Sequence, residues 1–205
     1  MNRAVKAFSA ALMISAFALP ALTLPAWAAD DPAAVSVQNF YDALTASMKT
    51  SGGTKARFDK LKPAVEQDFD LQGMTALSVG PSWASISAAD QKTLVDAFER
   101  MTVANYARNF NSYSGEKFVV DPDVTQRGTD KYVKSTLQPS SGAPTAFNYR
   151  LHQVGTGWKI VDVYLAGNIS QLAQKRADFA STLSTSGPQG LAKKIDALAD
   201  KELSG

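Results

Sequence analysis

Apolar residues recur at helical spacing near the start of the chain. In residues 31–49, Val37, Phe40 and Leu44 fall on one face of a helix. The Asp31-Pro32 pair is typical of a helix start, because the carboxylate can accept a bond from a free backbone N–H and proline fits the first turn. The same spacing predicts two shorter helices, over residues 54–67 and from residue 69 to the Gly-Pro break at 80–81.

The longest predicted helix runs from residue 87 to about residue 113. Ser87 and Asp90 form an S-x-x-D pattern, which caps helix N-termini. The apolar residues of this helix form two groups on different faces. Such a helix either contacts different neighbours along its length or uses one face to line a ligand cavity. The two groups are Leu94, Phe98 and Met101, and Val103, Tyr106 and Phe110.

The next part of the chain alternates apolar and polar residues, as strands with one buried face do. Short turns with glycine or proline separate the predicted strands, which indicates antiparallel pairing. Two helices follow, over residues 170–184 and from the Gly-Pro break at 187–188 to about residue 202. This order predicts an α+β fold, in which helices wrap around a curved antiparallel sheet of about four strands and enclose an apolar cavity. The strands are predicted over residues 117–120, 131–138, 145–153 and 158–165.

Residues 1–28 have the features of a secretory signal peptide. Arg3 and Lys6 precede an apolar stretch that ends in the cleavage motif Ala-Trp-Ala. We therefore expect a cleaved signal peptide, export to the periplasm, and a single domain over residues 29–205. Without the two basic residues of the signal, 19 basic residues face 19 acidic ones. A neutral chain of this kind is not expected to bind nucleic acid, which requires clustered Lys and Arg.

The absence of Cys and the presence of one His, His152, restrict the possible chemistry. They exclude disulfides, nucleophilic triads based on Cys or His, and most metal sites. We therefore expect no metal and no cofactor. Asp162, in the middle of the last predicted strand, is the main candidate for chemistry. It is either a general base, as in cone-shaped α+β isomerases, or a structural carboxylate held by Arg150, Arg176 or backbone N–H groups.

Large aromatic and methionine side chains are spread over the predicted helices and strands. Flexible methionines and large rings suit an adaptable apolar pocket. The same composition also suits an ordinary packed core, so the pattern alone leaves both interpretations open.

Residues 158–179, WKIVDVYLAGNISQLAQKRADF, carry the most specific pattern of the chain. A Trp-Lys strand with a central Asp leads through Gly-x-x-Ser into a helix with Arg176 and Phe179. This stretch resembles the MlaC family of periplasmic phospholipid-binding proteins, also called the toluene-tolerance family. Residues 79–83 and 110–118 look closest to its hopanoid-associated branch, HpnM. Family members commonly have Asn-Tyr-Arg before the final Phe, whereas this chain has Gln-Lys-Arg at residues 174–176.

The resemblance implies a periplasmic shuttle that carries phospholipid or a hopanoid-type lipid. Its implied partners are an inner-membrane ABC transporter complex and an outer-membrane lipoprotein complex, and we expect a monomer without enzymatic activity. The alternatives are a small isomerase-like enzyme with Asp162 as base and an adaptor that binds no ligand. We expect Asp162 and Arg176 to form a structural pair. The expected lipid-binding residues are Phe40, Phe69, Met74, Phe98, Met101, Tyr132, Tyr149 and Tyr164.

Overall fold

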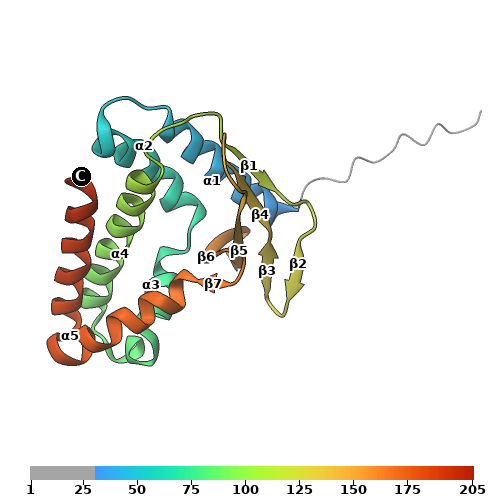
Figure 1. The fold of residues 1–205 in the computed structure, drawn as a ribbon. Helices are drawn as coiled ribbons and strands as arrows, with labels where there is room; N and C mark the ends of the chain where they lie inside the picture. Colours follow the sequence, from blue (N-terminus) through green and yellow to red (C-terminus); the bar gives the residue numbers. More distant parts are fainter. Residues whose placement is uncertain (1–30) are drawn as a thin grey trace, which may run out of the picture.

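The computed structural model describes residues 31–205, so the predicted signal peptide lies outside the described residues. Within that range, the helices begin and end close to the predicted positions (Figure 1). None of the helices in residues 31–205 combines the length and the apolarity needed to cross a membrane. The helices are α1 (Pro32–Met48), α2 (Gly53–Asp68), α3 (Leu71–Val79), the short 3-10 helix η1 (Gly80–Ser85), α4 (Ala88–Asn109) and α5 (Gln171–Leu203).

Side-chain caps fix the helix starts, as the sequence indicates. Asp31 accepts a hydrogen bond from the N–H of Ala33, and Ser87 accepts one from the N–H of Asp90. Helix α4 ends at Asn109, about four residues before its predicted end. Helix α5 joins both predicted C-terminal helices across a kink at Gly187, whose φ of 64° and ψ of −173° are non-helical.

The sheet is antiparallel and has seven strands rather than about four. The predicted strand over residues 131–138 is interrupted at Lys134, but its register against β5 is the same on both sides of the break. Two short strands were not predicted, β2 and β7. Their few residues carry no clear alternation of apolar and polar side chains. The strands are β1 (Lys117–Val120), β2 (Thr125–Arg127), β3 (Asp130–Val133), β4 (Ser135–Gln138), β5 (Thr145–Val154), β6 (Gly157–Leu165) and β7 (Ile169–Ser170).

A β-bulge in β6 changes which of its side chains share a face. Arg150 of β5 pairs with Asp162, but its neighbour Leu151 pairs with Ile160, so Val161 is an extra residue. A bulge of this kind locally breaks the alternation of side chains along a strand. As a result Ile160, Val161 and Asp162 are all buried.

Helices α2 to α5 lie on one side of the sheet (Figure 1). Buried apolar residues of the helices and of strands β3, β5 and β6 form one core. Helix α1 packs on the sheet through Tyr41, whose ring meets that of Tyr149 at 5.6 Å in an edge-on contact. The hydroxyl of Tyr41 shares a buried hydrogen bond of 2.6 Å with Ser135. Burial raises the pKa of Tyr41 to about 12, so its hydroxyl stays neutral at physiological pH.

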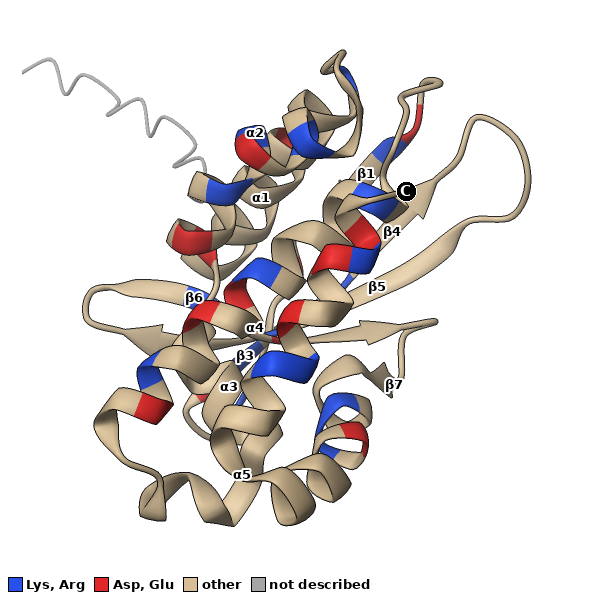
Figure 2. Ribbon diagram, turned by 90° about the vertical axis from the view of Figure 1, so that its left-hand side faces the viewer, with Lys and Arg blue, Asp and Glu red and all other residues tan. Residues whose placement is uncertain are grey.

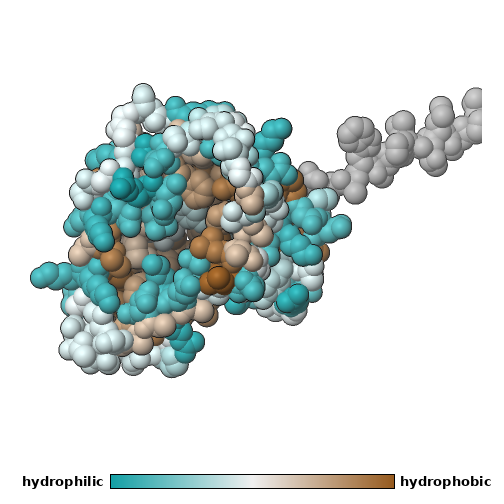
Figure 3. Space-filling model, viewed as in Figure 1, coloured by the Kyte–Doolittle hydropathy of each residue, from teal (hydrophilic) through white to brown (hydrophobic). Residues whose placement is uncertain are grey.

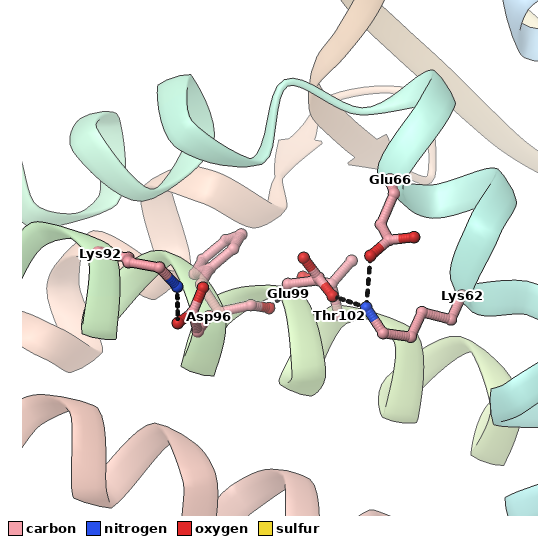
Figure 4. Close-up of polar contacts among 7 residues, drawn as sticks. Lys62, Glu66, Lys92, Asp96, Glu99 and Thr102 are labelled. Carbon is pink, nitrogen blue, oxygen red and sulfur yellow. Dashed lines mark hydrogen bonds and ion pairs between the residues drawn. The ribbon is translucent and has the colours of Figure 1, made fainter.

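Charged side chains cross-link the helices at the surface. The Lys62 ammonium of α2 binds Glu66 on its own helix and Glu99 on α4 (Figure 4). Its hydrogen bonds, first that to Glu66 and second that to Glu99 in size of effect, raise the pKa of Lys62. On the face shown in Figure 2, Lys and Arg are interspersed with Asp and Glu along α4. This mixture agrees with the balanced charge of residues 29–205.

Candidate ligand-binding pocket

A pocket of about 360 Å³ lies between α4, α3, the start of α5 and the strands β5 and β6. Its volume is within the range of about 300–1,000 Å³ that is usual for small-molecule sites. Figure 3 shows a hollow between the helices and the sheet, with apolar residues inside it and hydrophilic residues around it. The hollow is therefore the natural place for a ligand with a large apolar part.

One face of α4 forms the longest wall of the pocket. Each of the lining residues is three or four positions away from another one, as neighbours on one face of a helix are, so together they form one row. The row covers twelve steps, or about 18 Å at 1.5 Å per residue. Both apolar groups that the sequence indicates on this helix contribute to the wall. The row consists of Phe98, Met101, Thr102, Asn105, Tyr106, Asn109 and Phe110.

Phe69 and Met74 complete the wall between the helices and the sheet. Phe69 is held by a bridge to Ile160 of β6, and the next N–H, that of Asp70, donates to the Ile160 carbonyl at 2.9 Å. The Asp70 carboxylate then accepts a bond from the N–H of Gly73, which starts α3 and sets Met74 against the pocket. These contacts place Phe69 and Met74 at the pocket.

The strands supply Phe147, Val163 and Leu165, and the first turns of α5 supply Leu172 and two polar residues. The Asp162 carboxylate holds this end of α5. It accepts hydrogen bonds from the N–H of Leu172 at 3.1 Å and from the Ser170 hydroxyl at 2.6 Å. The bonds fix the start of α5 at the edge of the pocket.

Polar side chains at the pocket are few, and none of the lining residues is acidic. Burial raises the pKa of the Tyr106 hydroxyl, which therefore remains neutral. A pocket whose lining has neither an acidic residue nor a histidine is better suited to binding than to acid–base catalysis. No group of acidic residues and His within residues 31–205 is arranged to hold a metal ion. The polar lining residues are Thr102, Asn105, Asn109, Gln171 and Lys175.

The structure brings four of the eight expected lipid-binding residues together in the pocket wall: Phe69, Met74, Phe98 and Met101. Phe40 lies behind this wall, with its ring 4.9 Å from the ring of Phe69. Phe40 therefore supports the wall rather than forming its surface.

The three expected tyrosines are not in the wall. Tyr149 is buried in the core against Tyr41. Tyr164 alternates along β6 with Val163 and Leu165, so it points to the opposite face of the sheet. Tyr132 is next to it, with the two rings 6.5 Å apart. The sequence shows that these residues are large and aromatic but not which face of an element meets the pocket.

Asp162 and Arg176 do not form the expected pair. The Asp162 carboxylate is bound by backbone N–H groups and by Ser170 instead, which is one of the structural alternatives the sequence leaves open. The Arg176 side chain lies against Gly80, where a Cβ atom would be 3.0 Å from its Nε atom. Asp162 is also absent from the pocket wall.

Sequence reasoning missed the polar lining residues. Asn105 and Asn109 lie among the apolar positions of α4 and give no signal of their own. Lys175 gives one signal, because it stands where the family resemblance has Tyr in its Asn-Tyr-Arg run. That departure marks the position but does not show that it faces a pocket.

An α+β fold with an apolar pocket and a polar rim is suited to binding a ligand with a large apolar part. Residues 36–197 match the sequence profile of the family described as "MlaC protein", so the chain belongs to the MlaC family. Among curated proteins, no sequence matches the chain.

Among solved structures, the fold is similar to that of the phospholipid-binding protein from Ralstonia solanacearum, which was determined in complex with a phospholipid. The TM-score is 0.73 and the sequence identity is 21%. The similarity covers 84% of this chain and 99% of the other. At this level of identity the comparison establishes the fold.

Proposed function

We propose that the protein binds one phospholipid, with an acyl chain in the pocket along α4 and the headgroup at the polar rim of the pocket. The observation that supports this most is the row of lining residues on α4, in which Phe98 and Met101 are buried whereas the polar Asn105 and Asn109 are exposed. The phospholipid in the structure of the Ralstonia solanacearum protein supports the same class of ligand.

The energetics of transfer explain why a carrier requires such a pocket. Burial of one methylene group is favourable by about 0.8 kcal/mol. Exposing an acyl chain of roughly 15 methylenes to water therefore costs about 12 kcal/mol, unless apolar side chains cover it. The pocket wall supplies this cover from large, flexible side chains such as Met74 and Met101. A lipid that is covered in this way can leave one membrane and reach another.

We further propose that the protein carries its lipid through the periplasm, after cleavage of the signal peptide over residues 1–28. The expected partners are an inner-membrane ABC transporter complex and an outer-membrane lipoprotein complex, between which it shuttles as a monomer. Membership of the MlaC family supports this role. The hopanoid-type cargo that the HpnM resemblance implies stays a prediction, and extraction of the bound lipid distinguishes it from phospholipid.

The two alternatives receive less support from the structure. An isomerase-like enzyme would need Asp162 to face a substrate, but this carboxylate is buried, bound by three donors and outside the pocket wall. An adaptor with a solid core would have no pocket of this size. Both observations favour a binding protein.

The substitution Thr102→Trp tests the pocket directly. Thr102 is half-buried in the wall, and its hydroxyl donates to the Phe98 carbonyl at 2.8 Å. Thr93 is a matched control on the same helix, since it is exposed and donates to the Ala89 carbonyl at 3.0 Å. Both proteins are incubated with phospholipid vesicles, separated from them and extracted for quantification by mass spectrometry.

We expect the Thr102→Trp protein to lose most of its bound lipid, because the indole ring occupies the pocket. The Thr93→Trp protein should retain about one lipid per chain, and circular dichroism should show the same helix content for both. Equal lipid recovery from the two variants would contradict the proposed location of the acyl chain.

A further inference from the structure

Lys175 is the single charged residue among the residues that line the pocket. It lies in the second turn of α5, one turn after Leu172, and its side chain is half-buried. Within residues 31–205, no carboxylate forms an ion pair with its ammonium group. A partly desolvated cation without a partner at the edge of an apolar pocket is a favourable place for an anionic group.

Other groups near Lys175 leave this role to its side chain. In the first turn of α5, the N–H of Leu172 already donates to Asp162 and that of Ala173 to Ser170, so these two groups are not free to bind an anion. Gln171 donates to the Ile169 carbonyl at 3.3 Å. Across the pocket, Asn105 of α4 is exposed and adds a neutral amide to the rim.

We propose that the pocket selects lipids with a net negative headgroup, whose phosphate binds the ammonium group of Lys175. This inference rests on the proposed function. A phosphodiester with a neutral alcohol, as in phosphatidylglycerol, brings one negative charge to Lys175, and its hydroxyl groups can bond to Asn105. In phosphatidylethanolamine a second, positive group accompanies the phosphate. The pocket lining has no carboxylate to receive that ammonium.

The same reasoning disfavours a neutral lipid. A hopanoid or another uncharged polycyclic alcohol would fill the apolar part of the pocket but leave Lys175 without a counter-charge. Selectivity between two lipids depends on such unmatched groups as well as on favourable contacts. The geometry therefore makes Lys175 a specificity-determining residue.

The test is a competition between two lipids for the mature protein. The protein is incubated with vesicles of equal parts phosphatidylglycerol and phosphatidylethanolamine with identical acyl chains, separated from them, and extracted for mass spectrometry. The variants are Lys175→Gln, Lys175→Arg and Lys175→Glu. Lys193→Gln is the control, because Lys193 is exposed on the same helix and lies outside the pocket lining.

We expect the wild-type protein and the Lys175→Arg and Lys193→Gln variants to prefer phosphatidylglycerol by roughly tenfold, a ratio that corresponds to about 1.4 kcal/mol. Lys175→Gln should lower the preference to near one, because the neutral amide no longer distinguishes a headgroup of net negative charge from one without net charge. Lys175→Glu should reverse the preference. Inorganic phosphate at millimolar concentration should not release the lipid, because the acyl chain supplies most of the binding.

Several results would overturn this inference. If Lys175→Gln and Lys175→Glu bind the two lipids in the wild-type ratio, Lys175 does not select the headgroup, although lipid binding itself stands. Release of the lipid by inorganic phosphate would indicate a site for free phosphate rather than for a headgroup. If the wild-type protein acquires no lipid from the vesicles, the proposed function fails, and the inference fails with it.

Discussion

The structure assigns Asp162 a structural role that mutagenesis can measure. Its Oδ1 atom accepts bonds from the N–H groups of Val163 at 2.8 Å and Leu172 at 3.1 Å, and its Oδ2 atom accepts the Ser170 hydroxyl at 2.6 Å. Asp162→Ala removes both acceptor oxygens at a buried position and leaves three donors without a partner. An unsatisfied buried donor costs about 1–3 kcal/mol, so we expect the free energy of unfolding to fall by roughly 3 kcal/mol.

Asp162→Asn should be much milder. The amide oxygen can still accept both N–H groups, and the amide nitrogen can donate to Ser170, whose oxygen also accepts the N–H of Ala173 at 3.0 Å. The charge assistance and the acceptor of the Ser170 hydroxyl are lost, at about 1 kcal/mol in total. Lipid binding should be retained, because Asp162 is outside the pocket wall.

Urea unfolding followed by circular dichroism measures both variants. The reasoning predicts a difference of about 2 kcal/mol between Ala and Asn, with equal slopes of the unfolding transition. Ala and Asn variants of equal stability would refute the assigned hydrogen bonds. Loss of lipid binding in a stable Asn variant would instead indicate that the carboxylate acts on the ligand.

Two further predictions concern stability. Burial raises the pKa of Asp68 from 3.8 to about 6, although Lys159 opposes this shift. Because the folded state holds the proton of Asp68 more tightly than the unfolded state does, the wild-type protein loses stability as pH rises from 3.8 towards 6. Asp68→Asn removes this loss. It should raise the free energy of unfolding by up to about 3 kcal/mol at pH 8 and by much less at pH 4. Urea titrations at both pH values check this, and an equal gain at both would contradict it. Gly187→Ala should lower the free energy of unfolding by about 1–3 kcal/mol, because φ 64° and ψ −173° suit only glycine. A Cβ atom at this position meets nothing within 4 Å, so the cost comes from the backbone conformation alone. A thermal melt should show a decrease of several degrees, and an unchanged melting temperature would mean that α5 does not need this backbone conformation.

Features set by neighbouring residues could be predicted from the sequence. Asp31 and Ser87 cap their helices as expected, and the Gly-Pro break at 187–188 coincides with the kink of α5. In these cases the signal and its consequence lie within a few residues of each other. The α+β class was also predicted correctly, because it depends on the order of the elements.

Features set by distant contacts could not be predicted. The break at Lys134 coincides with two contacts from other segments, since its carbonyl accepts the N–H of Asp121 and the neighbouring Ser135 bonds to the Phe147 carbonyl. The bulge at Val161 likewise depends on the pairing of β6 with β5.

The candidate site shows the same division. Phe98 and Met101 were expected in the pocket and lie in its wall, because the pattern of α4 already marks this face. Tyr149 has the same composition signal, yet it packs on Tyr41 of α1, which a single sequence does not reveal. Lys175 was missed because its exposure and its distance from carboxylates appear only once α5 is docked.

The measurement that tests the central claim most directly is native mass spectrometry of the mature protein, purified from a bacterial periplasm without detergent. We predict a complex with close to one phospholipid per chain, and organic extraction should return that lipid. A ligand-free mass that does not change after incubation with phospholipid vesicles would contradict the account, since the pocket would then have no lipid to cover.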